Sequence, residues 1–167
     1  MPTAWGKFIA QMAPWDWFIN PFSFRTEPVP DAAIAGIKEF FGLVQRQASL
    51  PIGWLIGEEF GRVGGRFHCH ALVTGVRQLR RDFWWREAFR RFGRTRIEPF
   101  DPRRGAAFYA SKYAAKQLGA LHLGGYLGGV QLSSLERPRA AGRGEEVACS
   151  ADMPKTYFRL GLKRWHR

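Results

Sequence analysis

The chain has 167 residues, which is enough for one domain with a proper core and too few for a second domain of ordinary size. Lys and Arg number 26 against 14 Asp and Glu, and the resulting net charge of +12 indicates a polyanionic partner, nucleic acid first, rather than a basic surface kept only for solubility. Cys69 and Cys149 have no paired metal spacing, which argues against a disulfide framework. Without a long apolar run or a leader-like start, we expect a cytosolic protein with no membrane partner.

The first part of the chain is predicted to contain a helix, a strand and a second helix. Residues 1–14 carry apolar side chains at helical spacing up to a proline, which favours a short docking helix. The aromatic residues 15–25 indicate a strand buried on both faces, with Pro21 at a bulge or an edge. Asp31 is predicted to be the N-cap of a core helix. The apolar positions with helical period in that helix are Ile34, Ile37, Phe41 and Val44.

The middle of the chain predicts a hairpin, a helix and a further strand. Residues 52–60 and 66–75 are both strand-like, and the short glycine-rich linker 61–65 between them suits an antiparallel hairpin. A helix rich in Phe, Trp and Arg is predicted over 79–92. A strand follows after Gly93 and ends near Phe100.

The last part predicts a helix and then a less regular tail. Asp101 as N-cap, with proline at the next position, opens a helix that should run to about Gly119. The remaining residues, 121–167, read as a loop-rich basic extension with room for one edge strand, and only 156–162 look ordered. Together these elements predict a single α+β domain with a central antiparallel sheet flanked by helices.

The strongest chemical motif is a histidine pair inside a predicted strand. His68 and His70 stand two residues apart, so both side chains point to one face of the sheet and can grip one cation. A carboxylate is available on the partner strand, where alternation lets only one of Glu58 and Glu59 face the histidines. Two nitrogens and a carboxylate suit Mn²⁺ or Mg²⁺ held at a phosphate, although ligand type alone leaves zinc open.

A second motif lies on the last predicted helix. At about 100° per residue, phenols and ammonium groups share one face there: Tyr109, Lys112, Tyr113 and Lys116. Tyrosine and lysine at this spacing are common on surface helices, but beside a metal they are what a transesterification on DNA needs. A tyrosine oxygen attacks the phosphate, the phosphotyrosine conserves the bond energy, and a lysine lowers the phenol pKa or stabilises the transition state.

These residues resemble the His-hydrophobe-His superfamily of replication initiators, relaxases and related transposases. The segment GEEFGRVGGRFHCHALV resembles the metal-binding hairpin of that superfamily, and the tyrosine helix resembles that of two-tyrosine initiators. The resemblance covers most of residues 15–119. It implies a nuclease core (15–120) with an RRM-like or ferredoxin-like sheet, between the docking helix and the extension. It also favours Glu59 as the carboxylate ligand, which leaves Glu58 as an exposed strand charge.

The function implied by the resemblance is rolling-circle initiation, with nicking and joining of single-stranded DNA or an origin hairpin through a 5′-phosphotyrosine. Tyr109 and Tyr113 would be the nucleophiles, and a separate host helicase would unwind the duplex. A transposase or a relaxase shares this chemistry. The alternative in another class is a non-catalytic RRM-like binder of single strands that uses its aromatics and arginines.

Basic side chains beyond the tyrosine helix are expected to contact the DNA backbone, although a solvated helix face is the plainer interpretation of the run from Arg77 to Arg96. The residues assigned to DNA are Arg25, Arg66, Arg80, Arg81, Arg90 and Arg91.

Overall fold

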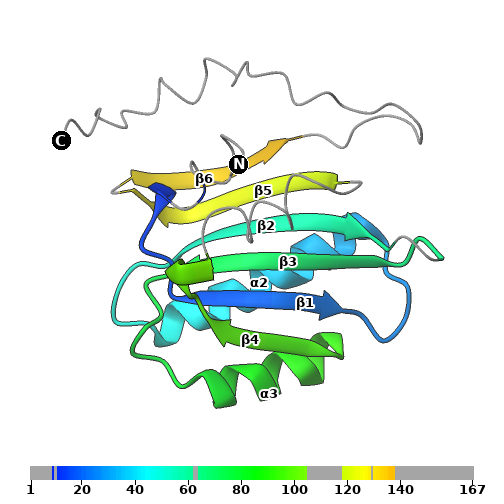
Figure 1. Cartoon of the computed structure of the whole chain (residues 1–167), viewed down its shortest axis with the longest axis horizontal. Coiled ribbons are helices and arrows are strands. Elements are labelled where there is room, and N and C mark those ends of the chain that lie inside the picture. The colour runs from blue at the N-terminus through cyan, green and yellow to red at the C-terminus, as the bar shows by residue number, and fades with distance from the viewer. Residues whose placement is uncertain (1–8, 10, 62–63, 105–117, 129, 138–167) are drawn as a thin grey trace.

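The computed structural model describes residues 9, 11–61, 64–104, 118–128 and 130–137 (Figure 1). The expected order of strand, helix, strand, strand, helix and strand is confirmed from β1 to β4, and a second hairpin follows. The elements are β1 (Trp17–Ser23), α2 (Pro30–Gln47), β2 (Gly53–Phe60), β3 (Phe67–Thr74), α3 (Arg81–Phe92), β4 (Thr95–Pro99), the 3-10 turn η1 (Pro102–Arg104), β5 (Leu118–Leu127) and β6 (Val130–Arg137).

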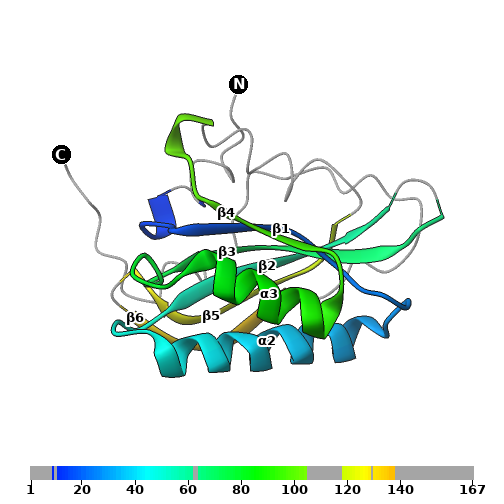
Figure 2. The same cartoon turned by 90° about the horizontal axis from the view of Figure 1, so that it is seen from below.

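The described strands form one six-stranded sheet in the order β4-β1-β3-β2-β5-β6, and all their pairings are antiparallel. Strands β1 to β4 with α2 and α3 follow the β-α-β-β-α-β connection of ferredoxin-like and RRM-like domains. Figure 2 shows both helices below the same face of the sheet. The predicted α+β class is therefore confirmed, and β5 and β6 extend the sheet beyond β2.

The bulge in β1 decides which core its aromatic side chains enter. β1 pairs with both β3 and β4, and its register with both neighbours shifts between Ile19 and Phe22. Pro21 lies in this bulge, as predicted, because proline cannot donate a hydrogen bond within a central strand. The extra residue returns Phe22 to the face of Ile19, where it is fully buried and its ring centroid lies 5.1 Å from that of Phe92.

Helix α2 begins before the predicted cap. Its N-cap is Val29, and Pro30 occupies the start of the helix, where the missing N–H costs nothing and the fixed φ suits the first turn. Asp31 was therefore wrong as the N-cap; it lies in the first turn, where its charge complements the helix dipole. The predicted apolar stripe is confirmed, because Ile34, Ile37, Phe41 and Val44 are all buried.

Predicted and observed elements agree closely around the central hairpin. β2 and β3 pair along their length, from Gly53 opposite Thr74 to Phe60 opposite Phe67. Helix α3 begins at Arg81 rather than Leu79 and ends at Phe92, as predicted, with Gly93 as its C-cap.

The segment after β4 differs most from prediction. The Asp101 carboxylate accepts the Arg103 N–H and so caps η1, and the hydrogen bond from the Arg103 side chain holds the pKa of Asp101 below its usual range. The helix predicted to reach Gly119 is wrong at its end, because Leu118 and Gly119 already belong to β5. Residues 105–117 lie outside the described residues.

The first part of the segment expected to be loop-rich instead forms most of β5 (Leu118–Leu127) and all of β6 (Val130–Arg137), where only one edge strand was foreseen. The recurring glycines were taken as a sign of loops, but in the structure Gly124 and Gly125 lie in a strand. A Cβ on Gly124 would overlap the indole of Trp54, and Gly125, with φ +73, lies at a register shift. Gly124 therefore leaves space for the Trp54 ring of the neighbouring strand β2, and Gly125 allows the irregular backbone of β5. Residues 138–167, including 156–162, lie outside the described residues.

Two buried clusters lie on opposite faces of the sheet. The helix-side core joins α2 and α3 to one face of β1, β2, β3 and β4. The open-face core lies on the other face and is built around Phe18, Leu55, Leu72 and Leu123. Ile9 and Met12, from the predicted docking helix, pack on this open-face core, whereas Trp5 and Phe8 lie outside the described residues. Beyond Leu55 and Leu72, toward the β2–β3 turn, the open face becomes polar.

Gly93 occupies a conformation that side chains rarely adopt, with φ +106, at the C-cap of α3. An added Cβ would lie 2.8 Å from Arg25 Cγ and 3.0 Å from the Ser23 carbonyl oxygen. We expect Gly93→Ala to lower the free energy of unfolding by roughly 2–3 kcal/mol, measured by urea denaturation. The matched control is Gly64→Ala: with φ +79 and nothing within 4 Å of the new Cβ, it should lose only about 1 kcal/mol. Equal losses would show that the contact with Arg25 is unimportant.

Candidate metal centre and basic groove

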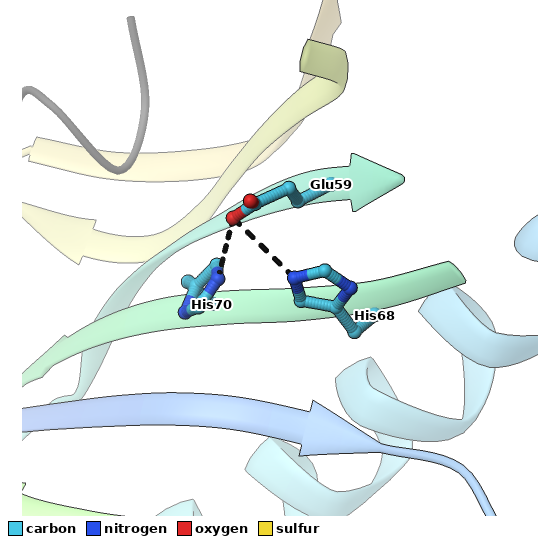
Figure 3. Close-up of side chains that lie close together, drawn as sticks. All are labelled: Glu59, His68 and His70. Carbon is cyan, nitrogen blue, oxygen red and sulfur yellow. Dashed lines mark hydrogen bonds and ion pairs between the residues drawn. The ribbon is translucent and has the colours of Figure 1, made fainter. Parts of the chain in front are cut away.

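A carboxylate and an imidazole pair meet on the open face near the β2–β3 turn. In the hairpin register, Glu59 lies opposite His68, and Gly57 lies opposite His70. The two histidines therefore lie on the same face of β3, as predicted, and Glu59 lies on that face too. The ligand atoms of Glu59, His68 and His70 all lie within 4.8 Å of one another. Figure 3 shows Glu59 reaching from β2 across to both rings on β3.

The Glu59 carboxylate lies between the rings. Its Oε2 atom is 2.7 Å from His70 Nε2 and 3.4 Å from His68 Nε2. One oxygen therefore faces both Nε2 atoms, and these same atoms are the natural donors to a shared cation. Donors this close together can be bridged by one ion without a change in the backbone.

Contacts behind the rings fix how each imidazole is presented. The Nδ1 of His68 lies 3.2 Å from the carbonyl oxygen of Arg66, an acceptor, so Nδ1 can donate a hydrogen bond there while Nε2 faces Glu59. A ligating histidine usually has such a carbonyl partner on its second nitrogen. The His70 ring stacks on Phe18 from β1, with centroids 6.4 Å apart and an interplanar angle of 15°.

Burial makes the group asymmetric. The side chains of Glu59 and His70 are 6% and 4% exposed, whereas that of His68 is 20% exposed. The open side of the cluster is therefore at His68. A carboxylate buried this deeply needs a compensating charge, which a divalent cation supplies. The group can thus hold a metal ion, with two nitrogens and an oxygen from the protein and the remaining positions toward His68 available to a substrate.

Glu58 faces the other side of the sheet. It was expected to be an exposed strand charge, and this was wrong, because Glu58 is fully buried. Its carboxylate accepts the Ala120 N–H at 2.9 Å and lies 2.9 Å from His122 Nε2. The two adjacent carboxylates therefore make different contacts: Glu59 contacts the histidine pair, and Glu58 links β2 to β5 through side-chain hydrogen bonds. The pair of Glu58 with His122 could not be predicted from the sequence, since its members are 64 residues apart.

A basic groove opens beside His68. It has a volume of about 300 Å³ and includes Arg25, Arg66 and Arg94 together with His68 in its lining. Arg25 and Arg66 were predicted to bind DNA, and the structure brings both to this groove. Arg94 lies in the basic run from Arg77 to Arg96 but was not among the individual residues assigned to DNA. Its position after the C-cap glycine, where the chain turns from α3 into β4, was the available signal.

The other arginines assigned to DNA lie away from the cluster. Arg80 pairs with Asp82 at 2.7 Å, and this hydrogen bond is the main reason that the pKa of Asp82 lies below its usual range. Arg90 and Arg91 both approach Glu87 on α3. Arg81 borders a different hollow, beside Trp15 and Phe100. The structure therefore divides the predicted set, and only Arg25 and Arg66 adjoin the histidines.

The tyrosine motif lies in a part of the chain that the structure does not describe. Tyr109, Lys112, Tyr113 and Lys116 all fall within 105–117. The nearest described residue after them is Leu118, the first of β5, which pairs directly with Glu59. Two residues after Lys116, the chain is therefore paired with the strand that carries the candidate ligand Glu59.

Comparisons with known proteins give no relative. No protein-family model matches the chain, and neither the curated proteins nor the solved structures contain a match. The class of protein is therefore defined by the structure alone: it is an α+β domain with a ferredoxin-like order of elements and a candidate metal centre on the open face of its sheet. None of the described helices has the length and apolar character to cross a membrane.

Proposed function

We propose that the chain is a metal-dependent endonuclease that nicks and rejoins single-stranded DNA through a tyrosine, as replication initiators of the His-hydrophobe-His superfamily do. The observation that carries this proposal is the group of Glu59, His68 and His70, joined across a hairpin and exposed on one side only. Rolling-circle initiation is the favoured role. Transposition and conjugative relaxation use the same chemistry and differ in the DNA that is cut.

The donor set fits Mn²⁺ or Mg²⁺ at a phosphate. Glu59 would supply the oxygen ligand and the histidines their Nε2 atoms, and the bound ion would act as a Lewis acid on the scissile phosphate. The protein residues orient the site. The Arg66 carbonyl holds the His68 ring, and Phe18 supports the His70 ring, so the donors are preorganised before substrate arrives.

The nucleophile is assigned to Tyr109 or Tyr113. Its oxygen would attack the phosphorus, a bond to the leaving 3′-oxygen would break, and the 5′-phosphate would remain on the enzyme until a 3′-hydroxyl reverses the step. Lys112 or Lys116 would stabilise the charge on the phosphate oxygens. The support for this assignment is that β5, which follows the tyrosine segment, begins opposite Glu59.

The alternative of a non-catalytic RRM-like binder accounts for less of the molecule. Such a binder uses exposed aromatic and basic side chains on its sheet and has no use for a carboxylate buried between imidazoles. Burying Glu59 there is costly unless a cation or proton compensates it, and a function that needs the metal gives a reason for that cost.

The decisive test is a covalent adduct. The full chain is incubated with a pool of labelled single-stranded oligonucleotides and Mn²⁺ or Mg²⁺, and denaturing electrophoresis then detects labelled protein. We expect a band that resists denaturation and disappears with EDTA. It should also disappear in the Tyr109→Phe, Tyr113→Phe double variant, because phenylalanine keeps the ring and removes the attacking oxygen.

Tyr126→Phe is the matched control, since Tyr126 is an exposed tyrosine on β5 outside the motif. This variant should form the adduct like the wild type. Binding of DNA with no adduct under any metal would reject the endonuclease and leave the non-catalytic binder. An adduct that persists in the double variant would reject the assigned nucleophiles.

A further inference from the structure

The geometry points to a binding track for single-stranded DNA that runs from the outer face of α3, over Arg25, into the basic groove beside His68. This inference rests on the proposed function for the identity of the ligand, and it specifies where the DNA strand lies on the protein. The track is defined by Trp85, Phe89, Arg25, Arg94 and Arg66. Trp85 and Phe89 have no role in the site described above.

The groove end of the track is complementary to a phosphate backbone. Arg25, Arg66 and Arg94 are exposed and line one hollow, and none of its described lining residues is acidic. Among the described residues, Arg25 and Arg94 form no ion pair, and Arg66 only approaches Glu27 at 4.0 Å. Exposed guanidinium groups gathered in a concave site, two of them without an acidic partner among the described residues, favour the binding of phosphates.

Arg25 is held in place and joins the two ends of the track. Its guanidinium donates to the Phe89 carbonyl oxygen at 3.2 Å and lies 5.8 Å from the centre of the Phe89 ring. Its stem passes over Gly93, where any side chain would collide with it. An arginine fixed in this way loses less side-chain entropy when it binds an anion.

The helix end of the track is an aromatic platform. Trp85 and Phe89 are 42% and 45% exposed, and their ring centroids lie 5.8 Å apart. The indole is anchored, because its Nε1 donates to the Thr95 carbonyl oxygen at 2.7 Å. Exposed rings that are held rigidly beside a basic groove favour nucleobases over an apolar protein partner, since every base can stack and its phosphate can reach the arginines.

His68 belongs to both the groove and the metal cluster. A strand stacked on Phe89, with its backbone on Arg25 and Arg94, would therefore lead toward the exposed side of that cluster. The track is specific for single strands, because bases in a duplex are already stacked and cannot lie on the platform.

The test is binding without cleavage. Fluorescence anisotropy measures the affinity of the full chain for a mixed-sequence single strand of about 20 nucleotides, in EDTA, over a range of salt. For the Arg25→Ala, Arg94→Ala double variant we expect binding weaker by at least about 10-fold at low salt. The slope of log K against log salt should also be shallower by about 1.4, for two lost phosphate contacts. Arg66 is left intact because it also donates to the Phe24 carbonyl.

Phe89→Ala should weaken binding by roughly 5-fold or more with the salt slope unchanged, because it removes stacking and no charge. Matched controls isolate the track. Phe83→Ala removes an exposed ring of α3 that makes no contact with Arg25, and Arg77→Ala removes an arginine that pairs with Asp16 elsewhere. Both should bind like the wild type. Circular dichroism of each variant confirms that α3 is retained.

The outcomes separate this inference from the endonuclease. If the arginine and Phe89 substitutions weaken binding no more than the control substitutions do, the track is overturned. The adduct test is unaffected by that result. Equal losses for a duplex of the same sequence also overturn the track. Selective loss in the track variants, together with no adduct in the wild type, supports the track and rejects the nuclease. A chain that binds no single strand overturns both.

Discussion

Replacing His70 by alanine is expected to remove most of the stabilisation that Mn²⁺ gives to the wild-type chain. At a metal concentration about 100 times the dissociation constant, binding to the folded state alone adds about 2.7 kcal/mol. For a chain of this size that corresponds to a rise of roughly 5–10 °C in the midpoint of thermal unfolding. The loss of one protein ligand should weaken binding by about 100-fold or more, since changes behind the ligands already cost up to that much. The same metal concentration then adds only about 0.4 kcal/mol.

The adjacent glutamates provide a matched pair for the same measurement. Glu59→Gln keeps the shape of the side chain and a hydrogen bond to His70 but removes the charge, so the metal response should be lost as in His70→Ala. Glu58→Gln changes the neighbouring residue on the other face, and its metal response should match the wild type. Thermal scans with Mn²⁺, Mg²⁺ and Zn²⁺, each against EDTA, provide the readout. A response that survives Glu59→Gln would show that the cation binds elsewhere.

The histidine side of this site could be predicted from the sequence because strand geometry alone places it. Residues two apart in a strand share a face, so His68 and His70 had to point the same way once the strand was recognised. The carboxylate was harder. Choosing between Glu58 and Glu59 requires the register of the hairpin, and the alternation of β2 alone does not fix it. The family resemblance favoured Glu59, and the observed pairing of Glu59 with His68 places it on the histidine face.

The features that could not be predicted are those that depend on contacts between distant segments. Glycine was taken as a sign of loops, yet Gly124 is in a strand because Trp54 leaves no space for a side chain. Arg94 and Arg25 are separated along the chain and meet only after β1 and α3 are placed. Asp31 is a residue type that often caps helices, but the helix begins one residue earlier, at Pro30. For Gly124 a tertiary neighbour overrode a local preference, whereas for Asp31 the adjacent proline did so.

Glu58 and Glu59 also show how one strand supports the site from both faces. Glu59 is the candidate metal ligand on the open face of the sheet, and on the opposite face Glu58 accepts a hydrogen bond from β5. β5 pairs with Glu59 at Leu118 and shifts register between Gly57 and Glu59, so the Glu58 contacts lie at the irregular part of that pairing. A strand edge beside a bulge has fewer ladder hydrogen bonds to hold it. The side-chain bonds of Glu58 therefore replace backbone bonds where β5 joins the sheet.

Glu58→Leu is accordingly expected to lower the free energy of unfolding by about 3–5 kcal/mol, a large share of the 5–15 kcal/mol typical of a domain. The substitution leaves the Ala120 N–H and the His122 ring buried without the carboxylate that they now contact. Glu58→Gln retains an acceptor for the amide and should lose about 1–2 kcal/mol. Urea denaturation followed by tryptophan fluorescence gives both values, with Glu39→Leu, an exposed position on α2, as the control near zero. If Glu58→Leu instead unfolds within about 1 kcal/mol of the wild type, the ladder between β2 and β5 is sufficient alone, and the buried pair has a purpose other than fastening β5.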